Sequence, residues 1–243
     1  MSTPAGGREP KTQLRLREAL IGHRPGEALF PRLDFELFAG EWLVVAGPNG
    51  AGKSSFVQTL LGTLPLLEGR RELGMPGLRF GYVPQRLELD PIWPLSALDV
   101  VCMGGAPWLK PFGRSATLRG RALELLEEVG LAGAAELPFR SLSGGQKQRA
   151  LIARALVAGA EVLVLDEPAN HLDLPGERAL VEMLSALHQR RAPTIVWISH
   201  RLEALLGRAD RIVFLRRGAF RVGPPRALLE EGVLEGFWEG GKA

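Results

Sequence analysis

The sequence has little cysteine, few histidines and almost no excess charge. Its 243 residues include one cysteine, Cys102, which excludes an internal disulfide and a metal cluster built from cysteines. The four histidines are scattered and show no metal-ligand spacing. A net charge of +3 gives no indication of nucleic-acid binding, so we expect no nucleic-acid partner.

Long apolar runs are also missing. A membrane-spanning helix needs roughly 18 apolar residues, and the longest candidate stretch, residues 150–165, is interrupted by Arg154 and Glu161. The first residues are polar and rich in Pro and Gly, without the apolar core of a signal peptide. We expect a cytoplasmic protein that reaches the inner face of the cell membrane only by docking on another chain.

Residues 47–54 carry the strongest chemical signal. They read Gly-Pro-Asn-Gly-Ala-Gly-Lys-Ser and fit the phosphate-loop pattern G-x-x-x-x-G-K-[ST]. The apolar run at 42–46 predicts a buried strand before the loop, and residues 54–61 predict a helix after it. The predicted nucleotide-binding residues are Gly47, Pro48, Asn49, Gly50, Ala51, Gly52, Lys53, Ser54 and Ser55.

This pattern suits a nucleotide phosphate for physical reasons. The glycines let backbone N–H groups curl around the β-phosphate, and a helix N-terminus adds positive partial charge. We expect Lys53 to reach the β- and γ-phosphates and the Ser54 hydroxyl to bind Mg²⁺.

The rest of the chain alternates strand and helix patterns, which predicts an α/β fold with a mostly parallel core sheet. Residues 1–12 predict a disordered tail, and 13–243 one domain containing a helical subdomain at 86–158. The region 67–70 is expected to end the first helical segment. Strands are predicted at 14–17, 33–37, 78–83, 162–165, 194–198, 211–215 and 219–222; helices are predicted from 96, at 117–129, 146–157, 178–189, 202–206 and 225–229.

An acidic pair, Asp166 and Glu167, directly follows the apolar run at 162–165. Phosphoryl transfer to water needs a metal ion held against the phosphates and a group that orients or deprotonates the water. Asp166 suits the metal, through a water, and Glu167 suits the base.

The pentapeptide Leu-Ser-Gly-Gly-Gln at 142–146 resembles the signature of the ATP-binding cassette (ABC) ATPases. Its order with the phosphate loop, Gln85, the acidic pair and His200 resembles a complete cassette from about residue 14 onwards. The resemblance implies a P-loop NTPase core with a mostly parallel sheet, an antiparallel β subdomain and a helical insert that carries the signature motif.

The resemblance also implies roles and partners. Two ATP molecules would be sandwiched in a head-to-tail homodimer, with the signature of one copy closing on the γ-phosphate held by the other. Gln85 would contact Mg²⁺ and the attacking water and sense a membrane partner, His200 would bond the γ-phosphate, and Asp173 would face the partner's phosphate loop. The implied signature residues are Ser143, Gly144, Gly145 and Gln146.

His23 occupies the place where these families usually stack an aromatic side chain on adenine. Two interpretations stay open from the sequence. The imidazole could stack on the base, more weakly than a tyrosine, or it could be a solvated turn histidine.

Two segments point to different relatives. Residues 81–86 and 93–104 resemble the zinc/manganese importer ATPases, whereas residues 167–173, Glu-Pro-Ala-Asn-His-Leu-Asp, are more similar to soluble, translation-associated ABC proteins. Those proteins carry two cassettes, and this chain carries one phosphate loop and one signature. We therefore favour the ATPase of a metal-ion importer, with permease subunits and an extracytoplasmic binding protein. The alternatives are another ABC transporter (a siderophore/vitamin-type importer or an exporter) and a soluble ABC ATPase acting on ribosomes or nucleic acid.

Overall fold

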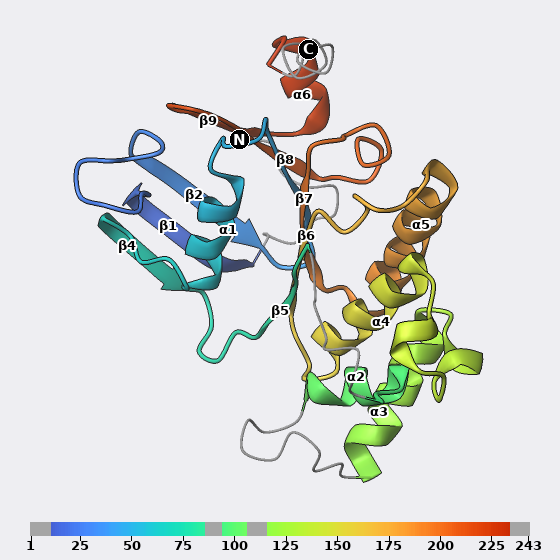
Figure 1. The fold of residues 1–243 in the computed structure, drawn as a ribbon. Coiled ribbons are helices and arrows are strands. Elements are labelled where there is room, and N and C mark those ends of the chain that lie inside the picture. The colour runs from blue at the N-terminus through green and yellow to red at the C-terminus, as the bar shows by residue number, and fades with distance from the viewer. Residues whose placement is uncertain (1–10, 86–93, 106–115, 234–243) are drawn as a thin grey trace. The chain divides into compact units, whose positions relative to one another are not determined.

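The computed structural model describes residues 11–85, 94–105 and 116–233, which form two compact units (Figure 1). The first unit contains the described residues up to Leu78 and from Pro193 onwards, and the second spans Arg79–Ala192. Residues 1–10 of the predicted tail lie outside the described residues, as do residues 86–93, which include Arg86 and Trp93 of the two segments that resemble metal importers. The first strand begins at Thr12.

The first unit contains an antiparallel sheet of three strands in the order β2-β1-β4. Strand β1 (Thr12–Leu20) buries alternate residues over the predicted stretch 14–17, with register shifts at either side of it, and β2 (Leu33–Phe38) buries alternate residues along its length. Strand β4 (Glu68–Leu73) is missing from the prediction, which was wrong to continue a helical segment to residues 67–70. The first helix ends at Gly62, and β4 consists mainly of charged residues without alternation.

A second group of strands in this unit leads to the phosphate loop. Strand β3 (Trp42–Ala46) pairs in parallel with β7 (Thr194–Ser199) and with β8 (Arg211–Arg216), and β8 forms an antiparallel hairpin with β9 (Ala219–Gly223). Every residue of β3 and β7 is buried, which explains their continuous apolar sequences. Helices α1 (Lys53–Leu61) and α6 (Pro225–Glu230) complete the unit.

One short helix of the prediction is wrong. Residues 202–206 form turns rather than a helix. The N–H groups of Leu205 and Leu206 both donate to the carbonyl of Leu202, at 2.8 and 2.9 Å. Leu202 and Leu205 are both buried, so packing of these two side chains fixes the turn.

Aromatic contacts join the parts of the first unit. The Phe56 ring of α1 lies 5.2 Å from Phe35 of β2 and 5.7 Å from Phe220 of β9, measured between ring centroids. The Arg211 guanidinium of β8 lies 4.6 Å from the Phe38 ring centroid. Helix α1 is therefore held from both the antiparallel sheet and the β8–β9 hairpin.

The second unit combines a parallel strand pair with helices. Strands β5 (Phe80–Val83) and β6 (Val162–Asp166) pair in register, and β5 approaches α4 so closely that a Cβ on Gly81 would lie 2.4 Å from the Ala155 carbonyl oxygen. The helices are α2 (Ala97–Met103), α3 (Ala116–Glu128), α4 (Gly144–Leu156) and α5 (Leu174–Arg191), with short 3₁₀ turns at Ala132–Ala134 and Phe139–Ser141. Parallel and antiparallel strands with helices confirm the predicted α/β class.

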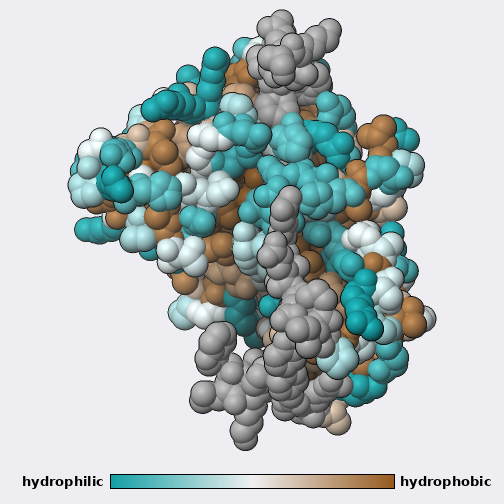
Figure 2. Space-filling model, in the orientation of Figure 1, coloured by the Kyte–Doolittle hydropathy of each residue, from teal (hydrophilic) through white to brown (hydrophobic). Residues whose placement is uncertain are grey.

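The surface is largely polar. Figure 2 shows hydrophilic residues over most of the visible described surface, with brown groups between them. The large exposed hydrophobic residues come from different elements: Leu73, Tyr82, Leu123, Leu137, Leu174, Val222 and Leu229. No helix within the described ranges has the length and apolar character required to cross a membrane.

The Arg211–Glu41 ion pair gives a test of this packing. Arg211 Nη2 donates to Glu41 Oε1 at 2.8 Å, and the Glu41 side chain is only 7% exposed. Burial raises the pKa of Glu41, while hydrogen bonds from Arg211 act in the opposite direction. We expect Arg211→Met to lower the free energy of unfolding by about 3–5 kcal/mol, because it leaves a buried carboxylate without its cation.

Urea unfolding measures this loss. Arg226→Met is the control, because it breaks the exposed pair between Arg226 and Glu230 and should change stability by at most about 0.5 kcal/mol. Adding Glu41→Gln to Arg211→Met should recover part of the loss. Equal effects of Arg211→Met and Arg226→Met would contradict the assignment.

Candidate functional site

The phosphate loop depends on two close backbone approaches. Gly47 has a φ of 149°, and a Cβ on it would lie 2.1 Å from the carbonyl oxygen of Leu215 in β8. Gly52 has a φ of 91°, and a Cβ there would lie 2.6 Å from Phe30 Cζ. Only glycine fits both positions, so the loop between β3 and α1 keeps its backbone N–H groups near the start of the helix.

The polar side chains of the loop differ in their surroundings. Lys53 is 7% exposed, and its ammonium donates to the carbonyl oxygens of Gly47 and Pro48 at 2.9 and 3.0 Å. Ser54 is exposed, whereas the Ser55 hydroxyl lies 3.0 Å from His23 Nε2. The loop therefore holds the Lys53 ammonium against its own carbonyl oxygens and exposes the neighbouring Ser54 hydroxyl.

Strand register places His200 level with this loop. Ala46 of β3 pairs with Ser199 of β7, so Gly47 and His200 each follow directly after the paired residues. His200 is exposed at the end of its buried strand. The structure thus brings together two predicted site residues that are far apart in the sequence.

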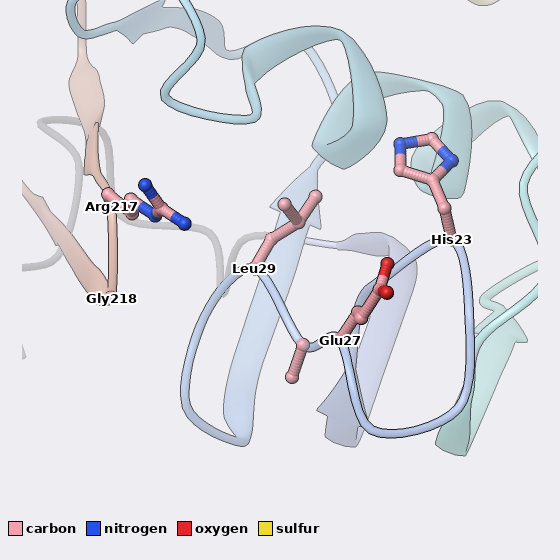
Figure 3. Close-up of a pocket in the computed structure, with 6 residues that line it drawn as sticks. His23, Glu27, Leu29, Arg217 and Gly218 are labelled. Carbon is pink, nitrogen blue, oxygen red and sulfur yellow. The ribbon is translucent and has the colours of Figure 1, made fainter.

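A cavity of about 470 Å³ lies within the first unit, in the range typical of small-molecule sites. It is lined by His23, Glu27, Ala28, Leu29, Arg217 and Gly218. Figure 3 shows the Arg217 side chain extending from the β8–β9 turn toward Leu29, with His23 and Glu27 on the loop after β1. The Gly218 N–H donates to the Leu29 carbonyl at 3.2 Å, which ties the turn to this loop.

This cavity adjoins the phosphate loop. The Leu29 Cδ1 atom lies 3.5 Å from where a Cβ on Gly52 would be, and His23 contacts Ser55 on α1. Sequence reasoning found His23 but missed Glu27, Leu29 and Arg217 as lining residues. No local pattern marks them, because the cavity forms only when the β8–β9 turn packs against the loop after β1.

In the second unit, the parallel pairing of β5 and β6 brings four polar side chains close together in two hydrogen-bonded pairs. Val83 pairs with Leu165, and Gln85 and Glu167 each lie two residues beyond this pair. Gln85 Nε2 donates a hydrogen bond to Glu167 Oε2 at 2.9 Å. Tyr82 donates its hydroxyl to Asp166 Oδ2 at 2.9 Å. Partial burial and the neighbouring Asp166 carboxylate raise the pKa of Tyr82, so the phenol remains a donor.

The signature segment begins helix α4. Ser143 caps the helix by accepting from the Gln146 N–H at 3.3 Å, and Gln146 Oε1 accepts from the Ser143 N–H at 2.9 Å. Ser143 and Gly144 are exposed, so this helix end faces solvent in the structure. Asp173 caps α5 in a similar way, accepting from the Gly176 N–H at 2.9 Å.

These groups fit a nucleotide triphosphate and Mg²⁺ chemically. Backbone N–H groups at a helix start and the Lys53 ammonium suit phosphate oxygens. The Ser54 hydroxyl in the first unit and the Asp166 carboxylate in the second unit are each hard oxygen donors, the kind of ligand that Mg²⁺ prefers.

Comparison with known proteins identifies the family. Residues 30–170 match the family described as ABC transporter. The chain is 36% identical over 206 residues to the zinc import ATP-binding protein ZnuC of Magnetococcus marinus, covering 85% of this chain and 75% of that protein. Its identity to ZnuC of Cereibacter sphaeroides is 40% over 188 residues, covering 77% and 73% of the two chains. The chain belongs to the ABC transporter family.

A solved structure agrees with this assignment. An ABC transporter classed as metal-chelate type, in an inward-facing conformation, superposes with a TM-score of 0.82 and 30% identity, covering 92% of this chain and 88% of that chain. The predicted resemblance to ABC ATPases of metal importers is thus confirmed. As an ABC cassette with a phosphate loop, the chain is an ATP-binding ATPase.

The cavity beside the phosphate loop predicts how Arg217 affects ATP binding. A guanidinium can stack on a nucleotide base or contact the ribose. Arg217→Ala should weaken ATP binding about two- to fivefold, which corresponds to about 0.5–1 kcal/mol for an exposed cation–ring contact. Binding of inorganic tripolyphosphate, which lacks base and ribose, should not change.

Calorimetry on three variants checks this prediction. Arg216→Ala is the matched control, because Arg216 is also exposed but does not line the cavity. Lys53→Ala should abolish binding of both ligands, because the phosphates lose their main cationic partner. Equal weakening of ATP and tripolyphosphate by Arg217→Ala would mean that Arg217 acts only through its charge.

Proposed function

We propose that this chain is the ATP-hydrolysing subunit of a zinc importer. The observation that carries the proposal is the identity of 36–40% to zinc import ATP-binding proteins over most of the chain. The similarity to a metal-chelate type transporter structure points to related cargo. Residues 167–173 resemble soluble, translation-associated ABC proteins, but this segment is seven residues long, whereas the similarity to zinc import proteins covers 77–85% of the chain.

ATP binding is the role of the first unit. The phosphate loop, residues 47–54, surrounds the β-phosphate with N–H groups, and Lys53 transfers its hydrogen bonds from the loop carbonyls to phosphate oxygens. Ser55 and His23 lie beside this loop, and the base occupies the cavity that His23 lines. His200 donates to the γ-phosphate.

Hydrolysis uses the acidic pair at the end of β6. Ser54, Gln85 and Asp166 would hold Mg²⁺, Asp166 through a water, and the bound ion would supply positive charge to stabilise the phosphates during transfer. Glu167 accepts a proton from water as the water oxygen attacks the γ-phosphorus. The bond from phosphorus to the β,γ-bridging oxygen breaks, and ADP leaves with that electron pair.

Transport requires a second copy of the chain and a membrane partner. In a head-to-tail homodimer, Ser143, Gly144, Gly145 and Gln146 bind the γ-phosphate of the ATP held by the partner, since an exposed helix N-terminus attracts anions. Asp173 faces the partner subunit's phosphate loop. ATP closes the dimer, and hydrolysis with product release reopens it.

This cycle drives permease subunits at the cytoplasmic face of the membrane. An extracytoplasmic binding protein delivers zinc to the permease, and the metal does not contact this chain.

The base assignment predicts a specific phenotype. Glu167→Gln keeps the shape of the side chain but cannot accept a proton, so ATP binding and ATP-dependent dimerisation should persist while hydrolysis falls by at least about a hundredfold. Phosphate release and analytical ultracentrifugation measure the two properties. A variant that hydrolyses ATP at the wild-type rate would refute the assignment.

Affinity capture tests the importer. Glu167→Gln with ATP, purified from native membranes, should retain a polytopic permease and a zinc-binding extracytoplasmic protein, identified by mass spectrometry. Lys53→Ala is the control for ATP-dependent assembly. Recovery of a permease for another cargo would change the substrate, and recovery of ribosomal proteins would replace the transport function.

A further inference from the structure

Asn170 lies in the segment at 167–173, between strand β6 and helix α5. Its Nδ2 donates a hydrogen bond to Glu167 Oε2. Gln85 Nε2 donates to the same oxygen at 2.9 Å. Two amide groups from separate loops therefore hold one oxygen of the proposed base.

The backbone around Glu167 needs such support. Glu167 has a φ of 47°, a left-handed conformation that non-glycine residues rarely adopt. The Asn170 N–H donates to the Glu167 carbonyl at 3.2 Å, and the intervening Pro168 and Ala169 are buried. Asn170 thus closes the turn through both its backbone and its side chain.

We propose that Asn170 is a positioning residue that fixes the Glu167 carboxylate for ATP hydrolysis; this rests on the proposed role of Glu167 as base. A neutral amide can donate to an ionised carboxylate without competing for the proton of the attacking water. The same short loop ends at Asp173, which caps α5. A shift of Asp173 on dimer closure would therefore reach the base through the five intervening residues.

Two substitutions at position 170 separate positioning from packing. Asn170→Asp keeps the size of the side chain but replaces the donor by an acceptor beside a carboxylate. Asn170→Ala removes the contact altogether. We expect Asn170→Ala to lower kcat about tenfold, in line with loss of one hydrogen bond to a charged group, and Asn170→Asp to lower it more, both with KM for ATP unchanged.

A double-mutant cycle shows whether Asn170 acts through Glu167. In the Glu167→Gln background, Asn170→Ala should leave the residual hydrolysis rate unchanged, because the base that it positions is already lost. His171→Ala is the matched control: His171 is the exposed neighbour in the same loop, and its removal should leave kcat within about twofold.

The outcomes are distinct. An unchanged kcat for Asn170→Ala and Asn170→Asp would overturn the proposal, as would an equal loss in the Glu167→Gln background or a loss matched by His171→Ala. A rise in KM with unchanged kcat would assign Asn170 to ATP binding and also overturn it. Wild-type hydrolysis by Glu167→Gln would instead remove the proposed base, and the proposal with it.

Discussion

Close contact between backbone segments around Gly47 and Gly52 is the constraint on which the nucleotide-binding unit depends. The carbonyl of Leu215 in β8 occupies the space that a side chain on Gly47 would need, and Phe30 occupies it for Gly52. Because both neighbours are buried parts of the core, the loop has one backbone path. The phosphate-binding N–H groups are therefore fixed by packing, before any ligand contributes.

The register of the paired strands determines which polar side chains lie together at the strand ends. In the first unit, β3 and β7 end together and place His200 level with Gly47. In the second unit, β5 and β6 end together and bring Gln85 to Glu167 and Tyr82 to Asp166. A one-residue slip would turn every side chain of the shifted strand to the opposite face and separate these pairs, so the register of the strands determines the site.

What could be predicted from the sequence were features with a local cause. The phosphate-loop pattern, the buried strand β3 and the helix after the signature segment follow from neighbouring residues alone. Strand β4 was missed because its charged sequence forms an edge strand only by pairing with β1. The lining role of Arg217 and the bond of Asn170 to Glu167 depend on turns whose geometry no local pattern encodes.

A left-handed backbone conformation occurs at a glycine in the first unit and at a glutamate in the second. Gly52 adopts a left-handed conformation at little cost, because nothing but backbone is needed there. Glu167 adopts it with a side chain, at a cost of about 1–2 kcal/mol. The buried Pro168 and Ala169 and the amides of Gln85 and Asn170 offset that cost. The strained backbone therefore lies at the end of a buried strand, where the Glu167 carboxylate is held by the same contacts on which the proposed positioning role of Asn170 rests.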